Sequence, residues 1–210
     1  MSTPTVPDRS VSGHGQHQHP AAPLPRQTRN GGGRPRRGPA NVILVGLSGS
    51  GKSTVARLLA RRLGWRCVDT DQAIQRQAGI TVQQIFETQG EPAFRALETE
   101  AIMEACRRSR QVIATGGGAV VADANRAHML DGNLVVYLES SPEILASRLS
   151  RNIGREPRPL LGNSDLIDRL AELRRQREHH YQCAHHIVQT DQRTPREVVD
   201  VIAELVRAGS

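Results

Sequence analysis

Residues 46–54 read GLSGSGKST and match the pattern GxxxxGK[ST] in full. An apolar run, NVILV, occupies residues 41–45 just before it, and residues 55–64 (VARLLARRLG) follow with helical spacing. A glycine-rich turn between a strand and a helix lets backbone N–H groups point at phosphate oxygens, and the helix dipole adds its positive end. The stretch therefore predicts a phosphate-binding loop in an α/β domain.

Lys52 is the single lysine in a chain with 28 lysine and arginine residues together. A compact ammonium on a flexible stem suits a phosphate as a point charge. We therefore expect Lys52 to reach the β- and γ-phosphates of a nucleotide, and the Ser53 hydroxyl to ligate Mg²⁺.

Residues 1–39 are rich in Pro, Gly, Ser, Gln and Arg and contain no aromatic residue. Such a segment buries too little apolar surface to offset its ordering entropy, so we predict a disordered basic tail at 1–39 and one domain at 40–210. The tail holds most of the net charge of +7, which leaves the domain close to neutral. A short basic tail is usually solvated, so nucleic-acid binding is not expected.

Strands and helices alternate along the predicted domain, which predicts a three-layer α/β/α fold with a mostly parallel sheet. Ser141 precedes Pro142, residues 194–197 form a capping box, and Ser164 is expected to cap a helix running to about Tyr181. The five expected strands span residues 42–46, 66–69, 111–115, 133–139 and 186–190.

The cysteines and histidines show no recognised metal or redox spacing. With no apolar run of the roughly 18 residues a membrane span needs, and no secretory signal, we expect reduced thiols in a cytoplasmic protein. A histidine metal site stays open as a minor alternative. The residues in question are Cys67, Cys106 and Cys183, His14, His17 and His19, and the pairs His179–His180 and His185–His186.

Asp69-Thr70-Asp71 ends the second expected strand, and residues two apart in a strand point the same way. Both carboxylates are then expected to face the crevice beside the phosphate loop, where open α/β sheets bind ligands. One can hold Mg²⁺ and the other can accept a hydrogen bond from a substrate hydroxyl. A solvated acidic turn is the alternative.

Three glycines, at 116–118, follow the third expected strand, and close approach of a ligand to bare backbone explains them better than packing does. Three arginines stand at positions where a small anionic substrate would need cations: Arg95, Arg158 and Arg177. A single arginine on a helix is most often a surface residue. Only the set, together with the phosphate loop, favours a functional interpretation.

Residues 150–164 contain two prolines, two glycines and three arginines and join two predicted helices. Long connections of this kind often act as lids over active sites. We therefore predict a mobile lid at about 150–164.

Taken together, the motifs resemble those of the shikimate kinases, within the nucleoside-monophosphate-kinase-like P-loop group. The resemblance covers about residues 41–207, in order, and none of the tail. The matching pieces are GLSGSGKST, DTD, FETQGEPAFRALE, ATGGGAV and RPLL.

On the donor side, the resemblance implies that Asp69 assists a Mg²⁺ ion bound by Ser53, and that ATP is the phosphate donor. Arg158 would close with the lid onto the transferring phosphate, and Arg151 and Arg193 would lie against the adenine. The residues implied to cradle the phosphates are Gly49, Ser50, Gly51, Lys52, Ser53 and Thr54.

On the acceptor side, the resemblance implies that shikimate receives the phosphate on its 3-hydroxyl, in the pathway to chorismate and the aromatic amino acids. Asp71 would bind that hydroxyl, Arg95 and Arg177 would clamp the carboxylate, and the Gly117 backbone would contact the ring hydroxyls. Lys52, Asp71 and Arg158 are then the expected catalytic residues, in a monomeric enzyme.

Two departures from the family pattern stand out. The family usually shows RxPxY where this chain has Arg177-Glu178-His179-His180-Tyr181, which puts the local helix end in question. The lid also offers Arg155 as well as Arg158, and the position directly before PLL favours Arg158.

Two other functions remain open at this point. A gluconate-type kinase shares a similar loop, but it is expected to carry a longer Asp/His/Pro-rich segment where FETQGEPAFRALE stands. A non-catalytic nucleotide- or nucleic-acid-binding protein would use the basic tail as its working part.

Overall fold

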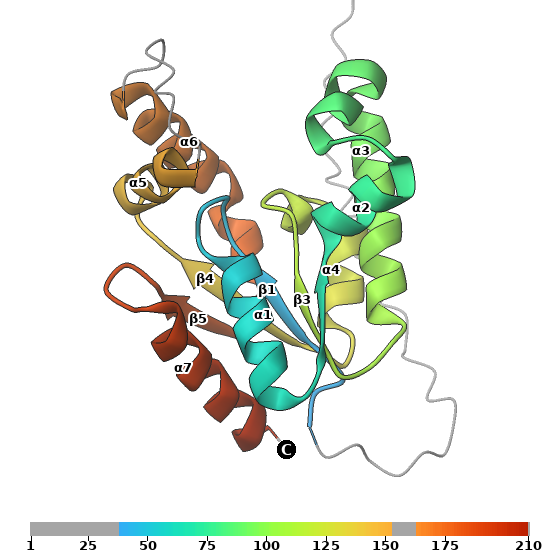
Figure 1. Cartoon of the computed structure of the whole chain (residues 1–210), viewed down its shortest axis with the longest axis vertical. Helices are drawn as coiled ribbons and strands as arrows, with labels where there is room; N and C mark the ends of the chain where they lie inside the picture. Colours follow the sequence, from blue (N-terminus) through green and yellow to red (C-terminus); the bar gives the residue numbers. More distant parts are fainter. Residues whose placement is uncertain (1–37, 153–162, 210) are drawn as a thin grey trace, which may run out of the picture. The chain divides into compact units, whose positions relative to one another are not determined.

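Five short strands form a parallel sheet in the computed structural model, which describes residues 38–152 and 163–209 (Figure 1). The strand order is β2-β3-β1-β4-β5, and each neighbouring pair is parallel. Every strand lies within one residue of its predicted bounds at either end. The strands are β1 (Val42–Val45), β2 (Arg66–Asp69), β3 (Gln111–Ala114), β4 (Leu134–Glu139) and β5 (His186–Gln189).

The helices alternate with these strands as predicted. The start of α5 at Pro142 and the reciprocal capping box of α7, between Thr194 and Glu197, confirm two of the predicted helix starts. The predicted cap at Ser164 is wrong, because α6 already begins at Asn163. The helices are α1 (Lys52–Leu63), α2 (Thr70–Ala78), α3 (Val82–Cys106), η1 (Ala119–Val121), α4 (Asp123–Leu130), α5 (Pro142–Asn152), α6 (Asn163–Tyr181) and α7 (Pro195–Ala208).

The central strand β1 shows why the sheet is covered on both faces. Val42 and Leu44 pack in the apolar cluster that α1 and α7 share, whereas Ile43 and Val45 pack in the cluster that includes α3 to α6 (Figure 1). Successive strand side chains point to opposite faces, so a fully buried parallel strand must be apolar at every position. The predicted three-layer α/β/α fold is therefore confirmed.

A smaller apolar cluster joins α2 to the first part of α3. It consists of Ile74, Ile85 and Phe94 and is separate from the two clusters on the sheet. Within α3, Gly90 has a φ of 81°, so the helical path breaks there and restarts before Pro92. Arg95 consequently lies near the start of the second part of α3, as its sequence context indicated.

The connection from β1 to α1 lies where the strand order reverses, because β3 and β4 flank β1 on opposite sides. Ligands of open α/β sheets bind at such a reversal. Residues 1–37 of the predicted tail and residues 153–162 of the predicted lid lie outside the described residues. In the described ranges, no helix is both long enough and apolar enough to cross a membrane.

Candidate active site

The phosphate loop closes between β1 and α1 through backbone conformations that favour glycine. Gly49 and Gly51 have φ values of 87° and 93°, and α1 begins directly afterwards at Lys52. At Gly46 an added Cβ would stand 2.6 Å from the carbonyl oxygen of Leu138 on β4. The loop is therefore held tightly against the sheet, with the N-terminus of α1 facing the crevice.

Lys52 is buried under this loop, and its ammonium completes the cradle. Its Nζ donates hydrogen bonds to the carbonyl oxygens of Gly46, at 2.7 Å, and Leu47, at 2.9 Å. Burial lowers the pKa of Lys52 to about 8, although the nearby carboxylates of Asp71 and Asp69 oppose the shift. The lysine is held by neutral carbonyls, with two carboxylates close by.

A cavity of about 520 Å³ opens beside the loop. It brings together residues from the donor loop, the DTD segment and the three-glycine loop, which are far apart in the sequence. The predicted site residues that line it are Gly49, Ser50, Gly51, Lys52, Ser53, Thr54, Asp69, Asp71, Gly117, Arg151 and Arg193.

Asp69 faces the loop from the end of β2. Its Oδ2 accepts a hydrogen bond of 2.6 Å from the Ser53 hydroxyl, while its Oδ1 accepts one of 3.1 Å from the backbone N–H of Gln72. The carboxylate thus caps the N-terminus of α2 and lies against the hydroxyl at the start of α1. Hydroxyl and carboxylate oxygens are ligands that suit Mg²⁺.

Asp71 lines the cavity as predicted, but it does so from a helix and not from the end of a strand. Strand β2 ends at Asp69, and Thr70 and Asp71 already belong to the first turn of α2, so the argument from strand alternation is wrong. The Oδ1 atom of Asp71 is buried and has no hydrogen-bond partner among the described residues. Burial, with the charge of Asp69, raises the pKa of Asp71.

Arg95 lies between two carboxylates of its own helix. Its Nη1 donates to Glu98 at 2.7 Å, and its Nη2 donates to Glu91 at 2.9 Å. The guanidinium lies against Gly118, where an added Cβ would stand 2.6 Å from Nη1. Arg95 therefore points its two terminal nitrogens at the three-glycine loop.

Glu98 was not singled out from the sequence, although its spacing of three residues from Arg95 is the signal of a helical ion pair. It is only 1% exposed, and its Oε1 has no hydrogen-bond partner among the described residues. A Cβ on Gly116 would stand 2.6 Å from this atom and 2.9 Å from Oδ1 of Asp71. The first glycine of the loop thus leaves room for two buried carboxylate oxygens, Oε1 of Glu98 and Oδ1 of Asp71.

Arg177 approaches the same loop from α6. Its Nη1 donates a hydrogen bond of 3.2 Å to the carbonyl oxygen of Gly117, and the Tyr181 hydroxyl donates one of 2.6 Å to the same oxygen. Burial raises the pKa of Glu98, and the charges of Arg95 and Arg177 both oppose this. Arg95 and Arg177 therefore flank the three-glycine loop, although neither lines the cavity itself.

The far end of the cavity contains a side chain that the sequence analysis missed. Arg148 lines it, with Nη1 bound to the Thr190 hydroxyl at 3.1 Å and Nη2 bound to the Thr190 carbonyl at 2.7 Å. These two bonds fix the plane of the guanidinium. Arg151 and Arg193 line the same end, together with Pro195.

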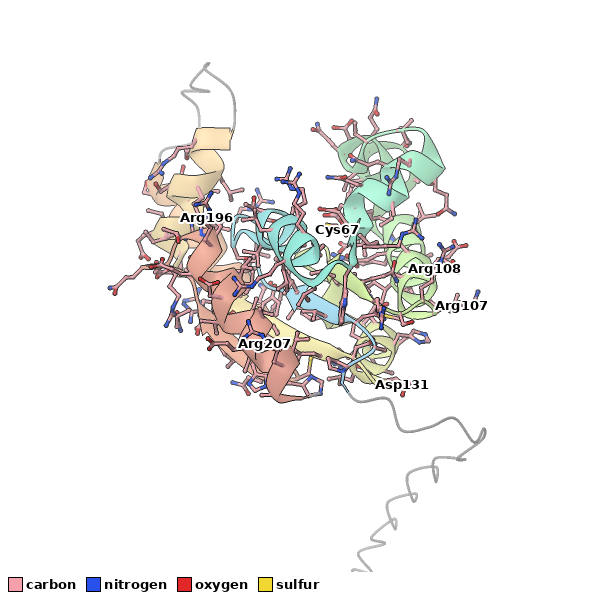
Figure 2. All side chains as sticks on the ribbon, turned by 60° about the horizontal axis from the view of Figure 1, so that its bottom comes forward. Cys67, Arg107, Arg108, Asp131, Arg196 and Arg207 are labelled. Atoms are coloured by element: carbon pink, nitrogen blue, oxygen red, sulfur yellow. The ribbon has the colours of Figure 1, made fainter. Side chains whose placement is uncertain are left out.

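The surface arginines differ from those of the site. Arg107 and Arg108, at the end of α3, and Arg196 and Arg207, on α7, are exposed, and their side chains project from the ribbon in Figure 2. Within the described part of the chain, Arg107 and Arg108 form ion pairs only with the exposed Glu104. Exposed pairs of this kind contribute little to stability.

The predictions for the lid arginines and the tail histidines concern residues that the structure does not describe. Arg158 and Arg155 of the lid lie outside the described residues, as do His14, His17 and His19. Among residues 38–152 and 163–209, no group of three or more His, Cys, Asp or Glu side chains could hold a metal ion.

Comparison with known proteins decides the family. The model that describes shikimate kinase matches residues 48–207. The chain belongs to the shikimate kinase family. A shikimate kinase of Geobacter sulfurreducens is 46% identical over 167 residues, which cover 80% of this chain and 91% of the relative. One of Symbiobacterium thermophilum is 45% identical over 165 residues, covering 78% of this chain and 94% of the relative.

Solved structures of shikimate kinases agree with this assignment. A shikimate kinase from Acinetobacter baumannii, in complex with shikimate, has a TM-score of 0.74 and 35% identity, and the match covers 83% of this chain and 96% of the other. One from Bacteroides thetaiotaomicron has a TM-score of 0.72 and 29% identity, covering 80% and 98%. The resemblance that the motifs indicated is therefore confirmed, and the chain is an ATP-dependent kinase of this family.

Proposed function

We propose that this shikimate kinase transfers the γ-phosphoryl group of ATP to the 3-hydroxyl of shikimate, giving shikimate 3-phosphate and ADP. The observation that carries the proposal is the cavity of about 520 Å³ in which the phosphate loop meets Asp71 and the three-glycine loop. Phosphoryl transfer depends mainly on positioning and on charge stabilisation. A phosphate cradle opposite a carboxylate and two arginines supplies both for a small anionic alcohol.

On the donor wall, the backbone N–H groups of residues 49–54 bind the phosphates of ATP. The Lys52 ammonium lies 2.7 Å from the Gly46 carbonyl and can exchange such neutral partners for the β- and γ-phosphate oxygens. Arg158, from the lid, adds a second cation to the transferring phosphate. Closure of the lid excludes water, which would otherwise hydrolyse ATP.

A Mg²⁺ ion fits beside this loop. Ser53 and Asp69 place a hydroxyl and a carboxylate oxygen 2.6 Å apart, and Mg²⁺ typically takes one or two protein oxygens, with phosphates and waters completing its octahedron. Ser53 would bind the ion directly, and Asp69 would assist, through water. When bound, the ion neutralises charge on the phosphate oxygens.

The acceptor wall comprises Asp71 and Gly117 together with Arg95 and Arg177, which lie beside the three-glycine loop. Asp71 accepts a hydrogen bond from the attacking hydroxyl and orients it toward the γ-phosphate. Burial raises the pKa of Asp71, which makes its carboxylate a better proton acceptor than an exposed aspartate. Arg95 and Arg177 bind the shikimate carboxylate, for which the planar guanidinium is well suited. Backbone groups of Gly117 contact the ring hydroxyls.

The adenine end of ATP lies at the far end of the cavity. Arg151 and Arg193 were predicted to lie against the base, and Arg148 adds a guanidinium whose plane is fixed by Thr190. A flat cation of this kind can stack on an aromatic ring.

A competition assay tests the proposed function. The purified chain is given ATP and Mg²⁺ with equal amounts of shikimate and gluconate, and the phosphorylated products are separated and counted. We expect shikimate 3-phosphate almost alone. Gluconate phosphate as the main product, or ATP hydrolysis without any phosphorylated alcohol, would contradict the proposal.

The proposed enzyme is a cytoplasmic monomer that acts on a small molecule and binds neither nucleic acid nor membrane. The free cysteines Cys67, Cys106 and Cys183 support a reducing compartment. Light scattering of the purified chain tests the monomer, because a dimer would double the measured mass.

A further inference from the structure

The last turn of α6 ends against the three-glycine loop and holds it through one carbonyl oxygen. Gly117 accepts a hydrogen bond of 2.6 Å from the Tyr181 hydroxyl and one of 3.2 Å from Arg177. Two donors therefore converge on a single acceptor of a loop that has no side chains of its own to fix it.

Tyr181 is anchored to the sheet as well as to the loop. It is fully buried, and its ring stacks on that of Tyr137 with the centroids 4.5 Å apart and the planes 8° apart. Tyr137 belongs to β4 and pairs in register with Val45, the last residue of β1 before the phosphate loop. Burial raises the pKa of Tyr181, so its hydroxyl keeps the proton that it donates.

The loop offers its free hydrogen-bond donors on its remaining backbone. No described residue accepts a hydrogen bond from the N–H groups of Gly117 or Gly118. The carbonyl of Gly117 and the N–H of Gly118 belong to one planar peptide unit and point in opposite directions. Fixing the carbonyl therefore fixes the direction in which the free N–H points.

The two donors on this carbonyl are not equivalent. Arg177 is also the residue assigned to the shikimate carboxylate, and its longer contact of 3.2 Å is the one that substrate binding would weaken. Tyr181 is buried and stacked on Tyr137, and it is not among the residues assigned to the substrate. The tyrosine bond therefore persists when the arginine turns to the substrate.

We propose that Tyr181 is a positioning residue for shikimate, whose hydroxyl holds the Gly117–Gly118 peptide in the orientation that receives the substrate. This inference rests on the proposed function. The Tyr181 hydroxyl donates its hydrogen bond to Gly117, so we expect its loss to affect shikimate more than ATP.

The test is Tyr181→Phe, which keeps the ring stack and removes only the hydroxyl. We expect the KM for shikimate to rise about fivefold, the worth of one net hydrogen bond, while kcat and the KM for ATP stay within about twofold. Tyr137→Phe is the matched control, because it removes a hydroxyl from the same ring stack. No described residue forms a hydrogen bond with the Tyr137 hydroxyl, so its KM for shikimate should not change.

Three results would overturn the proposal: an unchanged KM for shikimate in Tyr181→Phe, an equal rise in the KM for both substrates, or the same rise in Tyr137→Phe. Melting temperatures of both variants identify a loss of folding. If the chain does not use shikimate, the proposed function fails separately. In that case NMR of glycine-labelled protein still tests whether the Tyr181 hydroxyl orients the Gly117–Gly118 peptide. Tyr181→Phe should shift the Gly118 amide resonance, and Tyr137→Phe should not.

Discussion

The donor wall of the site carries a cation that is bound by neutral groups, whereas the cation of the acceptor wall, Arg95, lies beside the cavity and is already paired with carboxylates. Lys52 has no ion pair among the described residues, and its Nζ is bound by two neutral carbonyls. Arg95 is already paired with Glu91 and Glu98. Under the proposed function, phosphates would therefore meet a cation that is bound by neutral groups, whereas the carboxylate of the acceptor would meet a cation that two carboxylates already share.

This difference separates the tasks of the two walls. Charge on the donor wall acts on the phosphate that is transferred, so its loss should affect the rate. Charge on the acceptor wall is proposed to bind a carboxylate that is remote from the reacting atoms, so its loss should affect the affinity for shikimate. Variants on the two walls should therefore separate effects on kcat from effects on the affinity for shikimate.

The largest effect is expected from Lys52→Ala. Removing the only cation of the phosphate loop should lower kcat by about a thousandfold or more, measured as ADP release with shikimate present. Arg61→Ala, an exposed cation on the same helix, is the control and should keep full activity. A loss of less than about tenfold in Lys52→Ala would break the assignment of catalysis to the donor wall.

A smaller, selective effect is expected from Arg95→Ala. The Kd for shikimate, measured by calorimetry, should rise by tens of times, or roughly 2 kcal/mol, with the KM for ATP unchanged. The Kd of Arg95→Lys for shikimate should fall between those of the unmodified chain and Arg95→Ala, because an ammonium cannot pair bidentately with a carboxylate. Arg107→Ala, at the exposed residue that follows the end of the same helix, is the matched control. An unchanged affinity for shikimate in Arg95→Ala would refute the clamp.

A weaker effect should depend on pH through His180. Its Nδ1 lies 3.0 Å from Nη1 of Arg126, which also donates to the carbonyls of Val120 and Val121 just after the three glycines. Burial and the charges of His179 and Arg126 lower the pKa of His180, and Asp123 opposes them. The neutral ring that can accept from Arg126 is therefore fully present above about pH 6.5 and is lost as pH falls through the lowered pKa.

His180→Leu removes this acceptor at every pH. Between about pH 7.5 and pH 5.5 the KM for shikimate of the unmodified chain should rise about two- to threefold more than that of the variant. Parallel pH profiles for the two proteins would show that the histidine does not affect the acceptor wall.

The smallest effect is expected from deleting residues 1–39. Both walls of the cavity lie in the domain, so kcat and both KM values should stay within about twofold of those of the full chain. A large loss of activity would show that the tail takes part in the reaction, and would revive the interpretation in which the basic tail is the working part.

The two walls also differ in how much of them the sequence predicts. The donor loop is contiguous, so its pattern, its strand and its helix could all be read from residues 41–64. The acceptor wall combines segments that are distant in the chain: Gly117 and Tyr181, which form its central hydrogen bond, are 64 positions apart. No local pattern encodes such a pair, and only the family's RxPxY element points to the tyrosine.

Asp71 shows how a correct position can follow from a wrong reason. The alternation of strand side chains predicted that it faces the cavity, yet it does so from the first turn of α2. Glu98 shows the converse, because the spacing from Arg95 was visible and its burial was not. Burial depends on the packing of α3 against the glycine loop, which no helical pattern specifies.

Because the chain has a single lysine, the donor loop can be modified selectively by a reagent that reacts with amines. Lys52 carries the only side-chain amine of the chain, and burial lowers its pKa to about 8. At mildly alkaline pH about half of this amine is the nucleophilic free base, a fraction that an exposed lysine reaches only near pH 10. An amine-directed reagent small enough to enter the cavity would thus label a single side chain, and nucleotide bound over it would protect it. The chain's α-amino group ionises in the same range and would also react, so labelling is read from the peptide that contains Lys52. Its extent then measures how much of the enzyme has nucleotide bound, without any need to follow turnover.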